Sequence, residues 1–256
     1  AKKWFEKLAT AEVQSRIQKQ KKIHQYYEKL KSGRLENIFT IKWSDFKSLP
    51  FQDRLEYFEN ENNKSVSIAI PEAGFRVAYE RMLEFKKSVG QYNLNRDIPA
   101  FDGTSQLSIY QKNGSLVSSQ IIATLGLENK SFKTQDHATQ YIKEIAWREF
   151  YYSILFHRPE VEKNSFLPQY ENLDWSGNRE WFQRWCEGQT GFPIVDAGMR
   201  QLNQTGWMHN RVRMIVASFL VKDLLIDWRW GENYFMKMLL DGDLAPNNGG
   251  WQWAAS

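Results

Sequence analysis

The chain has 256 residues, 42% hydrophobic and 15% aromatic, and a formal net charge of +4. This length supports one large domain, or one and a half, and the mild basic bias allows a polyanionic partner without requiring one. The single cysteine, Cys186, excludes a disulfide framework and suits a reducing interior, and no apolar run reaches the roughly 20 residues that span a bilayer.

The first 70 residues differ in character from the rest of the chain. Residues 1–35 are charged and helix-prone, whereas residues 36–70 mix short apolar runs with polar clusters such as ENENNKS. We interpret residues 1–70 as a linker with helical segments and residues 71–256 as the main domain.

Apolar residues recur at helical spacing through residues 71–256, and strict alternation is scarce. The clearest helix shows Val212, Ile215, Val216, Phe219 and Leu220 on one face. Helices are expected over residues 71–90, 118–126, 135–157, 178–188, 193–204, 208–226 and 231–240. The pattern therefore predicts an all-α domain.

A polar loop with the sequence DGTSQLS occupies residues 102–108. Its Asp-Gly pair marks a turn, and the hydroxyls of Thr104, Ser105 and Ser108 then cluster just before another segment. Hydroxyls and backbone N–H groups in such a loop suit phosphate oxygens, particularly where a helix follows. The alternative is an ordinary polar loop with a helix cap.

The segment YIKEIAWREFYY places polar and aromatic residues on one helical face. Tyr141, Glu144, Trp147, Arg148 and Tyr151 recur at intervals of three and four residues. A structural helix normally buries aliphatic residues, so this face is typical of a helix that contacts a ligand, although a purely structural role stays open.

The segment after Trp207 carries Asn210, Arg211, Arg213 and Met214 at the start of an amphipathic helix. Arg213 needs an anionic partner if it is buried, and Asp241 or Asp243 could supply it. The four histidines are scattered without ligand spacing, so no metal site is expected. No arrangement of residues points to a catalytic nucleophile.

Three blocks carry a resemblance: WREFYY, the run from GQTGFPIVDAGMRQLNQTGWMHNRVRM to DWRWGENYF, and the final LLDGDLAPNNGGWQWAAS. Together they closely resemble the flavin-binding domain of DNA photolyases of the cyclobutane pyrimidine dimer class, on the microbial class I side. The resemblance covers residues 71–256 well and the first 70 weakly. It implies a helical FAD-binding domain that is truncated at the C-terminus and lacks the N-terminal α/β antenna domain.

The resemblance implies light-driven repair, in which reduced FAD donates an electron to a pyrimidine dimer that is flipped out of DNA and splits it. An antenna chromophore, folate or deazaflavin, is expected only in a full-length protein, and the truncated form should retain FAD weakly. A bacterial protein of this kind should act as a monomer in the cytoplasm, on DNA. Two alternatives are a cryptochrome-like photoreceptor that binds FAD without repair and a flavin-free helical protein that binds nucleic acid.

Residue roles follow from the same resemblance. Cofactor contacts are implied for Tyr92, Thr104, Ser105, Gln106, Leu107, Ser108, Tyr141, Arg148, Asn210, Arg213, Asp241, Gly242, Asp243 and Asn247. Contacts with DNA or the dimer are implied for Arg96, Glu144, Trp147, Asn210, Arg211, Met214 and Trp253. Catalytic roles are implied for Glu144, which would stabilise the dimer radical anion, and for Asn247, which would face the flavin N5 atom.

Trp175, Trp228 and Trp251 match the tryptophan relay that carries electrons to oxidised flavin in this family. Taken without the resemblance, the same three residues would be read as ordinary core tryptophans. The chain also departs from the family pattern at Gln106, where Arg is usual, and at Ser119, where the family has LSPR in place of LVSSQ. These departures remove positive charge near the expected cofactor phosphates.

Overall fold

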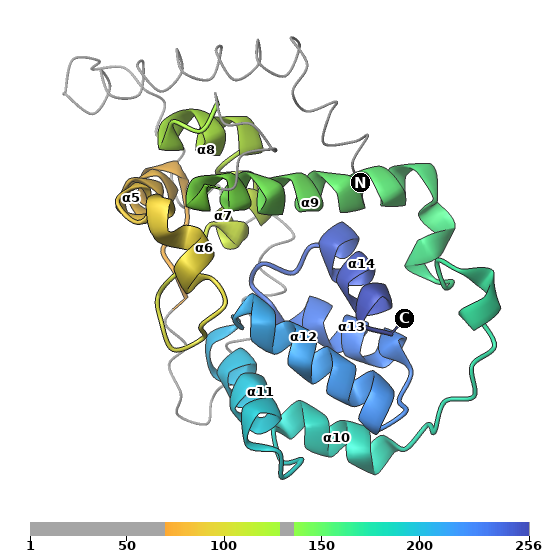
Figure 1. Cartoon of the computed structure of the whole chain (residues 1–256). Coiled ribbons are helices and arrows are strands. Elements are labelled where there is room, and N and C mark those ends of the chain that lie inside the picture. Colours follow the sequence, from red (N-terminus) through yellow and green to blue (C-terminus); the bar gives the residue numbers. More distant parts are fainter. Residues whose placement is uncertain (1–69, 129–135, 256) are drawn as a thin grey trace, which may run out of the picture.

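The computed structural model describes residues 70–128 and 136–255, and every regular element within these ranges is helical (Figure 1). The predicted all-α class is confirmed for this part of the chain. The predicted linker, apart from Ile70, lies outside the described residues, so the boundary between linker and domain stays a prediction.

The longer helices occur in a simple order along the chain. They are α5 (Phe75–Lys86), α6 (Tyr92–Asn95), α7 (Ser108–Lys112), α8 (Ser118–Leu125), α9 (His137–His157), α10 (Arg179–Glu187), α11 (Pro193–Thr205), α12 (Asn210–Ser218), α13 (Trp228–Met238) and α14 (Leu244–Ala255). Short 3-10 turns are η1 (Val89–Gln91), η2 (Pro159–Glu162) and η3 (Pro168–Tyr170), and a π-helical turn, η4 (Phe219–Asp223), follows α12.

Two sequence expectations need correction. The single helix predicted over residues 208–226 is α12 followed by the wider turn η4, and Ile215 on its expected apolar face is 41% exposed. Helix α14 was not predicted at all, because its sequence contains Pro246, Gly249 and Gly250, which are poor helix formers. Its helical form therefore depends on packing against other helices.

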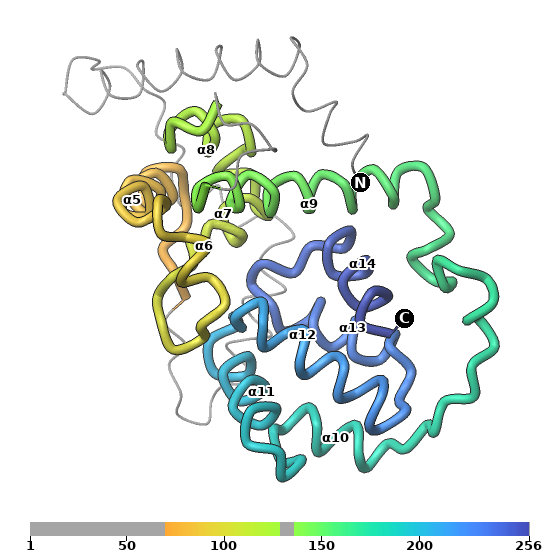
Figure 2. Tube along the Cα trace, in the orientation of Figure 1, coloured from red at the N-terminus to blue at the C-terminus, as the bar shows by residue number. Residues whose placement is uncertain are grey.

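Two hydrophobic clusters form the core. One joins α5, α8 and the first half of α9, and the other joins α10, α11, α12, η4, α13 and α14. Helix α9 begins at Asp136, whose carboxylate caps the first turn by accepting a hydrogen bond from the Thr139 N–H at 2.8 Å. Because α9 packs on both α6 and α14, it links the two clusters (Figure 2).

The crossing of α9 and α14 is close enough to require glycine. A Cβ atom at Gly249 would lie 2.1 Å from Cδ1 of Tyr151 on α9. Since both groups belong to packed helices, neither can move freely to make room. Gly249 thus sets the distance between the two helices.

We expect Gly249→Ala to lower the free energy of unfolding of the FAD-free chain by about 1–3 kcal/mol, because the added methyl group overpacks this crossing. Chemical denaturation measures the change. Gly250→Ala is the matched control, since a Cβ at Gly250 meets nothing within 4 Å. Equal stability of the two variants would contradict the close crossing.

Candidate functional site

A cavity of about 650 Å³ opens between α9 and the helices α12 to α14, with α6 and α7 at its side. This volume lies within the roughly 300–1,000 Å³ typical of cofactor and ligand sites. Every residue predicted to contact the cofactor, DNA or dimer lines this cavity, except Leu107. Arg148, Arg213, Asp243 and Asn247, which are distant in sequence, thereby share one space.

Leu107 is the exception among the predicted cofactor residues. Its side chain is fully buried in the cluster with α5 and α9, so it cannot form part of the cavity wall. An apolar side chain inside a loop of hydroxyl residues is drawn to the core by the hydrophobic effect. Its backbone N–H donates to Oγ of Ser105 at 3.3 Å and helps to shape the loop.

The loop at residues 102–108 is held in place from two directions. The Tyr141 hydroxyl on α9 donates to Oγ of Ser105 at 3.0 Å, and Nε of Arg81 on α5 donates to the Ser105 carbonyl at 3.1 Å. Burial raises the pKa of Tyr141 to about 12, so its phenol stays neutral and can serve as this donor. The loop is therefore a fixed wall of the cavity.

Two glutamines add neutral donors to this wall. Gln106 adopts a left-handed backbone conformation with φ of 53°, and its Nε2 donates to Asp102 at 3.2 Å. Gln111 on α7 was missed by sequence reasoning, since nothing in its local pattern distinguishes it. Its buried Nε2 lines the cavity and has no hydrogen-bond partner among the residues that the structure describes. A buried donor without a partner is costly, so Gln111 fits a cavity that receives a polar ligand group.

Two arginine–carboxylate pairs face each other across the cavity residues. Nη2 of Arg213 lies 3.0 Å from Oδ2 of Asp241, and Nη2 of Arg148 lies 3.1 Å from Oδ2 of Asp243. The choice between the two aspartates for Arg213 is thus settled in favour of Asp241. Arg213 is also fixed by a 2.8 Å hydrogen bond from Nε to the Met208 carbonyl.

Tyr152 is a further residue that sequence reasoning missed. Its hydroxyl donates to Oδ2 of Asp243 at 2.6 Å, and the Arg148 guanidinium lies 4.6 Å from its ring centre. Burial, together with the hydrogen bond to Asp243, raises the pKa of Tyr152 to about 12. The four-residue spacing from Arg148 was a usable signal, since such pairs meet on one helical face.

Asn247 lines the cavity from the first turn of α14. Its Nδ2 donates to the backbone carbonyl of Glu232 on α13 at 3.0 Å. This bond fixes the orientation of the amide against the neighbouring helix. The chain segment that carries the asparagine is itself anchored by the 2.9 Å bond from the Asn247 N–H to the Asp243 carbonyl.

The mouth of the cavity combines charges with exposed aromatic rings. Trp147 is 38% exposed and Trp253 is 60% exposed, and both line the cavity. Arg211 donates from Nε to Asp97 at 2.7 Å, which ties α12 to the segment after α6. Flat exposed rings beside basic side chains suit single-stranded or flipped bases.

Arg96 departs from the expectation of a free phosphate contact. Its side chain is only 9% exposed, and its Nη1 forms an ion pair with Oε1 of Glu144. Its guanidinium also lies 5.4 Å from the ring centre of Tyr92. Arg96 therefore has partners already, and a phosphate would have to share or displace them.

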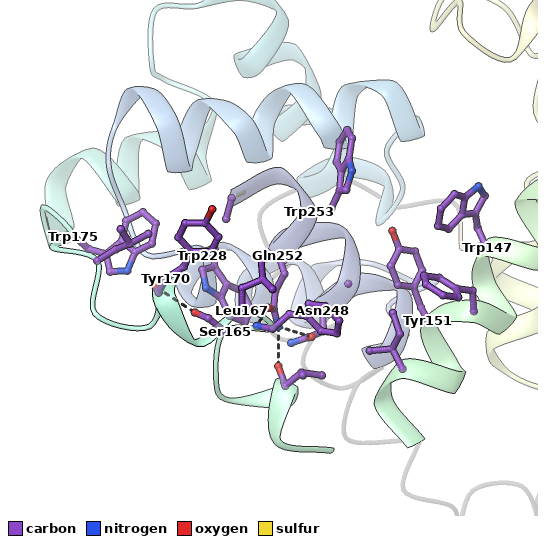
Figure 3. A pocket seen from close by; sticks show the side chains of 17 residues that line it. Trp147, Tyr151, Ser165, Leu167, Tyr170, Trp175, Trp228, Asn248, Gln252 and Trp253 are labelled. Carbon is purple, nitrogen blue, oxygen red and sulfur yellow. Dashed lines mark hydrogen bonds between the residues drawn. The ribbon is translucent and has the colours of Figure 1, made fainter. Parts of the chain in front are cut away.

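The three relay tryptophans divide between two cavities. Trp251 is buried in the wall of the main cavity, whereas Trp228, also buried, and the half-buried Trp175 line a second, apolar cavity of about 250 Å³ (Figure 3). Trp147 and Trp253 line both cavities. The ring of Trp251 contacts Phe235 at 5.0 Å and Trp185 at 6.0 Å between centroids.

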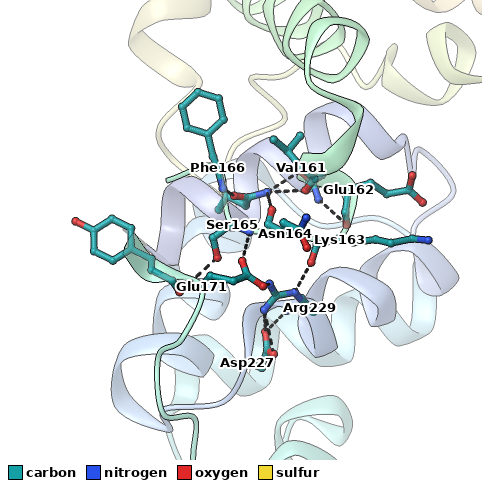
Figure 4. A network of polar contacts seen from close by, with 12 residues as sticks. Val161, Glu162, Lys163, Asn164, Ser165, Phe166, Glu171, Asp227 and Arg229 are labelled. Atoms are coloured by element: carbon teal, nitrogen blue, oxygen red, sulfur yellow. Dashed lines mark hydrogen bonds and ion pairs between the residues drawn. The ribbon is translucent and has the colours of Figure 1, made fainter. Parts of the chain in front are cut away.

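A polar network fixes the wall of the second cavity (Figure 4). Arg229 on α13 donates from Nε to the Lys163 carbonyl at 2.8 Å and from Nη2 to Glu171 at 2.7 Å. Its guanidinium lies 4.9 Å from the ring centre of Trp228 and also pairs with Asp227 at 3.3 Å. The irregular segment after α9 is thereby attached to α13 beside the buried tryptophan.

Two searches of the described residues bear on alternative sites. Residues 70–128 and 136–255 contain no group of three or more His, Cys, Asp or Glu side chains that could hold a metal ion. Within the same ranges, the helices are too short or too polar to cross a bilayer. Burial raises the pKa of the Cys186 thiol to about 12, which makes it a poor nucleophile at neutral pH.

Comparison with known proteins gives consistent results. A family model described as the FAD binding domain of DNA photolyase matches residues 141–256. The deoxyribodipyrimidine photo-lyase of Vibrio cholerae is 51% identical over 186 residues, which cover 72% of this chain and 40% of the relative. The corresponding protein of Escherichia coli is 45% identical over 207 residues, which cover 77% and 44%.

Solved structures agree with these relatives. A class III photolyase from Agrobacterium tumefaciens matches with a TM-score of 0.70 and 40% identity, over 86% of this chain and 44% of its own. A cryptochrome from Synechocystis matches with a TM-score of 0.67 and 32% identity, over 74% and 40%. The chain spans less than half the length of these relatives. With its helical architecture and shared cavity, the chain contains the FAD-binding domain of the DNA photolyase family.

Proposed function

We propose that the chain is the catalytic part of a light-driven DNA repair enzyme, a deoxyribodipyrimidine photo-lyase that splits cyclobutane pyrimidine dimers. One observation carries this proposal: the residues expected to hold FAD and those expected to meet the dimer line a single cavity. A cofactor that transfers an electron to its substrate needs this proximity.

The cavity residues suit FAD chemically. The hydroxyl loop and the buried Nε2 of Gln111 offer donors for the phosphates and ribityl chain. The Arg148–Asp243 and Arg213–Asp241 pairs and the fixed amide of Asn247 offer donors and acceptors for the edge of the isoalloxazine ring. Bound as FADH⁻, the cofactor supplies the excited electron for the reaction.

The residues at the mouth would hold the flipped dimer. Trp147 and Trp253 would stack on the pyrimidines, and Glu144 would accept a hydrogen bond from a pyrimidine N–H and stabilise the radical anion. Arg96 and Arg211 would meet the adjacent phosphates. Met214, whose Sδ lies 3.3 Å from Nη1 of Arg211, would fill the space beside the bases.

The tryptophans would restore oxidised flavin to its reduced state. Trp251 and Trp228 are buried and Trp175 is half-buried, so an electron could move from the surface inward by short steps. Indoles are oxidisable, and steps between neighbouring rings are far easier than one long transfer. We propose that the protein works as a monomer on DNA inside the bacterial cell, without a membrane partner.

A second candidate is a cryptochrome-like photoreceptor, favoured by the structural similarity to the Synechocystis cryptochrome. Glu144, Trp147, Met214 and Asn247 together favour the enzyme. The deciding experiment illuminates the reduced, FAD-loaded protein with DNA that contains pyrimidine dimers. Loss of dimers in the light, but not in the dark, supports repair, and no loss would leave the photoreceptor.

Glu144→Ala should reduce the yield of dimer repair by about tenfold or more while FAD stays bound, because the change removes a charged substrate contact. Repair per absorbed photon and the flavin spectrum of the same sample measure both effects. Glu180→Ala, on the distant helix α10, is the control and should behave as the unchanged protein. Normal repair by Glu144→Ala would contradict the role given to this residue.

A further inference from the structure

One oxygen of Glu144 is held by two donors from different elements. Nε2 of Gln140, one helical turn earlier on α9, donates to Oε1 at 2.7 Å. Nη1 of Arg96, just after α6, binds the same oxygen. Both donors therefore fix the carboxylate through Oε1.

The other oxygen is left for a ligand. Among residues 70–128 and 136–255, no donor forms a hydrogen bond with Oε2 of Glu144, and the side chain, 29% exposed, lines the main cavity. A carboxylate oxygen held in this way accepts hydrogen bonds. It therefore suits a pyrimidine edge that presents an N–H donor, such as N3–H of thymine.

Arg96 cannot be the only residue that holds Glu144. Its guanidinium also donates to Asp97 at 3.2 Å and is the group expected to meet a DNA phosphate. A phosphate carries stronger negative charge than a shared carboxylate and would compete for this guanidinium. Gln140 is neutral and half-buried, so a phosphate has little effect on its bond to Glu144.

We propose that Gln140 is a positioning residue, which keeps Oε2 of Glu144 directed at the flipped pyrimidine while Arg96 engages the DNA backbone. The inference rests on the proposed function, since it assumes that a dimer enters the cavity. No family motif in the sequence pointed to Gln140, and its role follows from its contact with Glu144.

The test is the dark affinity of the full-length, FAD-loaded protein for one oligonucleotide with a single thymine dimer and for the same undamaged sequence, at fixed salt. Gln140→Met, similar in shape but without a donor, should lower the preference for the dimer by about three- to tenfold. Its affinity for undamaged DNA should stay within about twofold of the unchanged protein, since its phosphate contacts are intact.

A matched control exists on α10. Nε2 of Gln183 donates to Oε1 of Glu187 at 2.6 Å with the same four-residue spacing, outside both cavities. Gln183→Met should change neither affinity. In a Glu144→Ala background, Gln140→Met should have no further effect, because the group that it positions is gone.

Three results would overturn the proposal for Gln140 alone, provided that the unchanged protein prefers the dimer. They are an unchanged preference in Gln140→Met, an equal loss of affinity for both DNAs, and a loss that persists in the Glu144→Ala background. An unchanged protein with no preference for the dimer would instead reject the proposed function, and the role of Gln140 with it. Equal thermal unfolding of the variants establishes that each one is folded.

Discussion

Arg213→Ala is expected to lower the free energy of unfolding by about 3 kcal/mol and to abolish FAD retention. The Asp241 side chain is 5% exposed, so the change leaves a buried carboxylate without its cation. The figure is at the lower end for buried pairs because Arg213 itself is 23% exposed. Denaturant unfolding and the visible absorbance of bound flavin measure the two effects.

The control for this variant is Arg184→Ala. Arg184 pairs with Glu180 at 3.2 Å on the surface of α10, where both side chains are exposed, so its loss should cost less than about 1 kcal/mol. The double variant Arg213→Ala, Asp241→Ala should regain part of the lost stability, because the unpaired charge is removed as well. A stability loss as small as that of Arg184→Ala would show that the cavity pair is not structurally important.

Trp251→Phe should block light-driven reduction of oxidised FAD almost completely, yet spare repair by protein that is already reduced. Phenylalanine keeps an aromatic ring against Phe235 but is much harder to oxidise than indole. The rate of flavin reduction under blue light, with an external reductant present, measures the first effect. Dimer loss after chemical reduction measures the second.

Trp185→Phe is the matched control for the relay. Trp185 is fully buried and contacts Trp251, but lies outside the three assigned positions. It should slow photoreduction little compared with Trp251→Phe. Normal photoreduction by Trp251→Phe, or an equal loss in both variants, would reject the assigned relay.

The helical class and most long helices could be predicted because their apolar residues recur at helical spacing. Helix α14 could not, since its residues are poor helix formers and its helical form is set by contacts with α9 and α13. The exposed side of Ile215 was also wrong. Periodicity defines a stripe, but which of its residues reach the core depends on where the neighbouring helices lie.

The resemblance, and not the periodicity, supplied the candidate site. It placed distant residues such as Tyr92 and Asp243 in one site, and the structure brings both to one cavity, although their roles stay predictions. Sequence alone left two partners open for Arg213, because Asp241 and Asp243 differ by only two residues. The fold separates them, since Arg148 on α9 takes the second aspartate.

Other residues were missed because their importance comes from tertiary contacts. Gln111 matters through a buried nitrogen without a partner, and Tyr152 through its bond to Asp243. Leu107 was wrongly placed on the cavity wall, because a motif identifies a loop but not which of its side chains face the core. Such details require coordinates.

The central claim is that the cavity between α9 and α14 is the FAD site, and a titration followed by the visible spectrum of bound flavin tests it most directly. We predict saturation at one FAD per chain, and loss of binding in a folded Gly250→Trp variant, which fills the cavity from an open position. Failure to bind FAD, or undiminished binding by Gly250→Trp, would contradict the account.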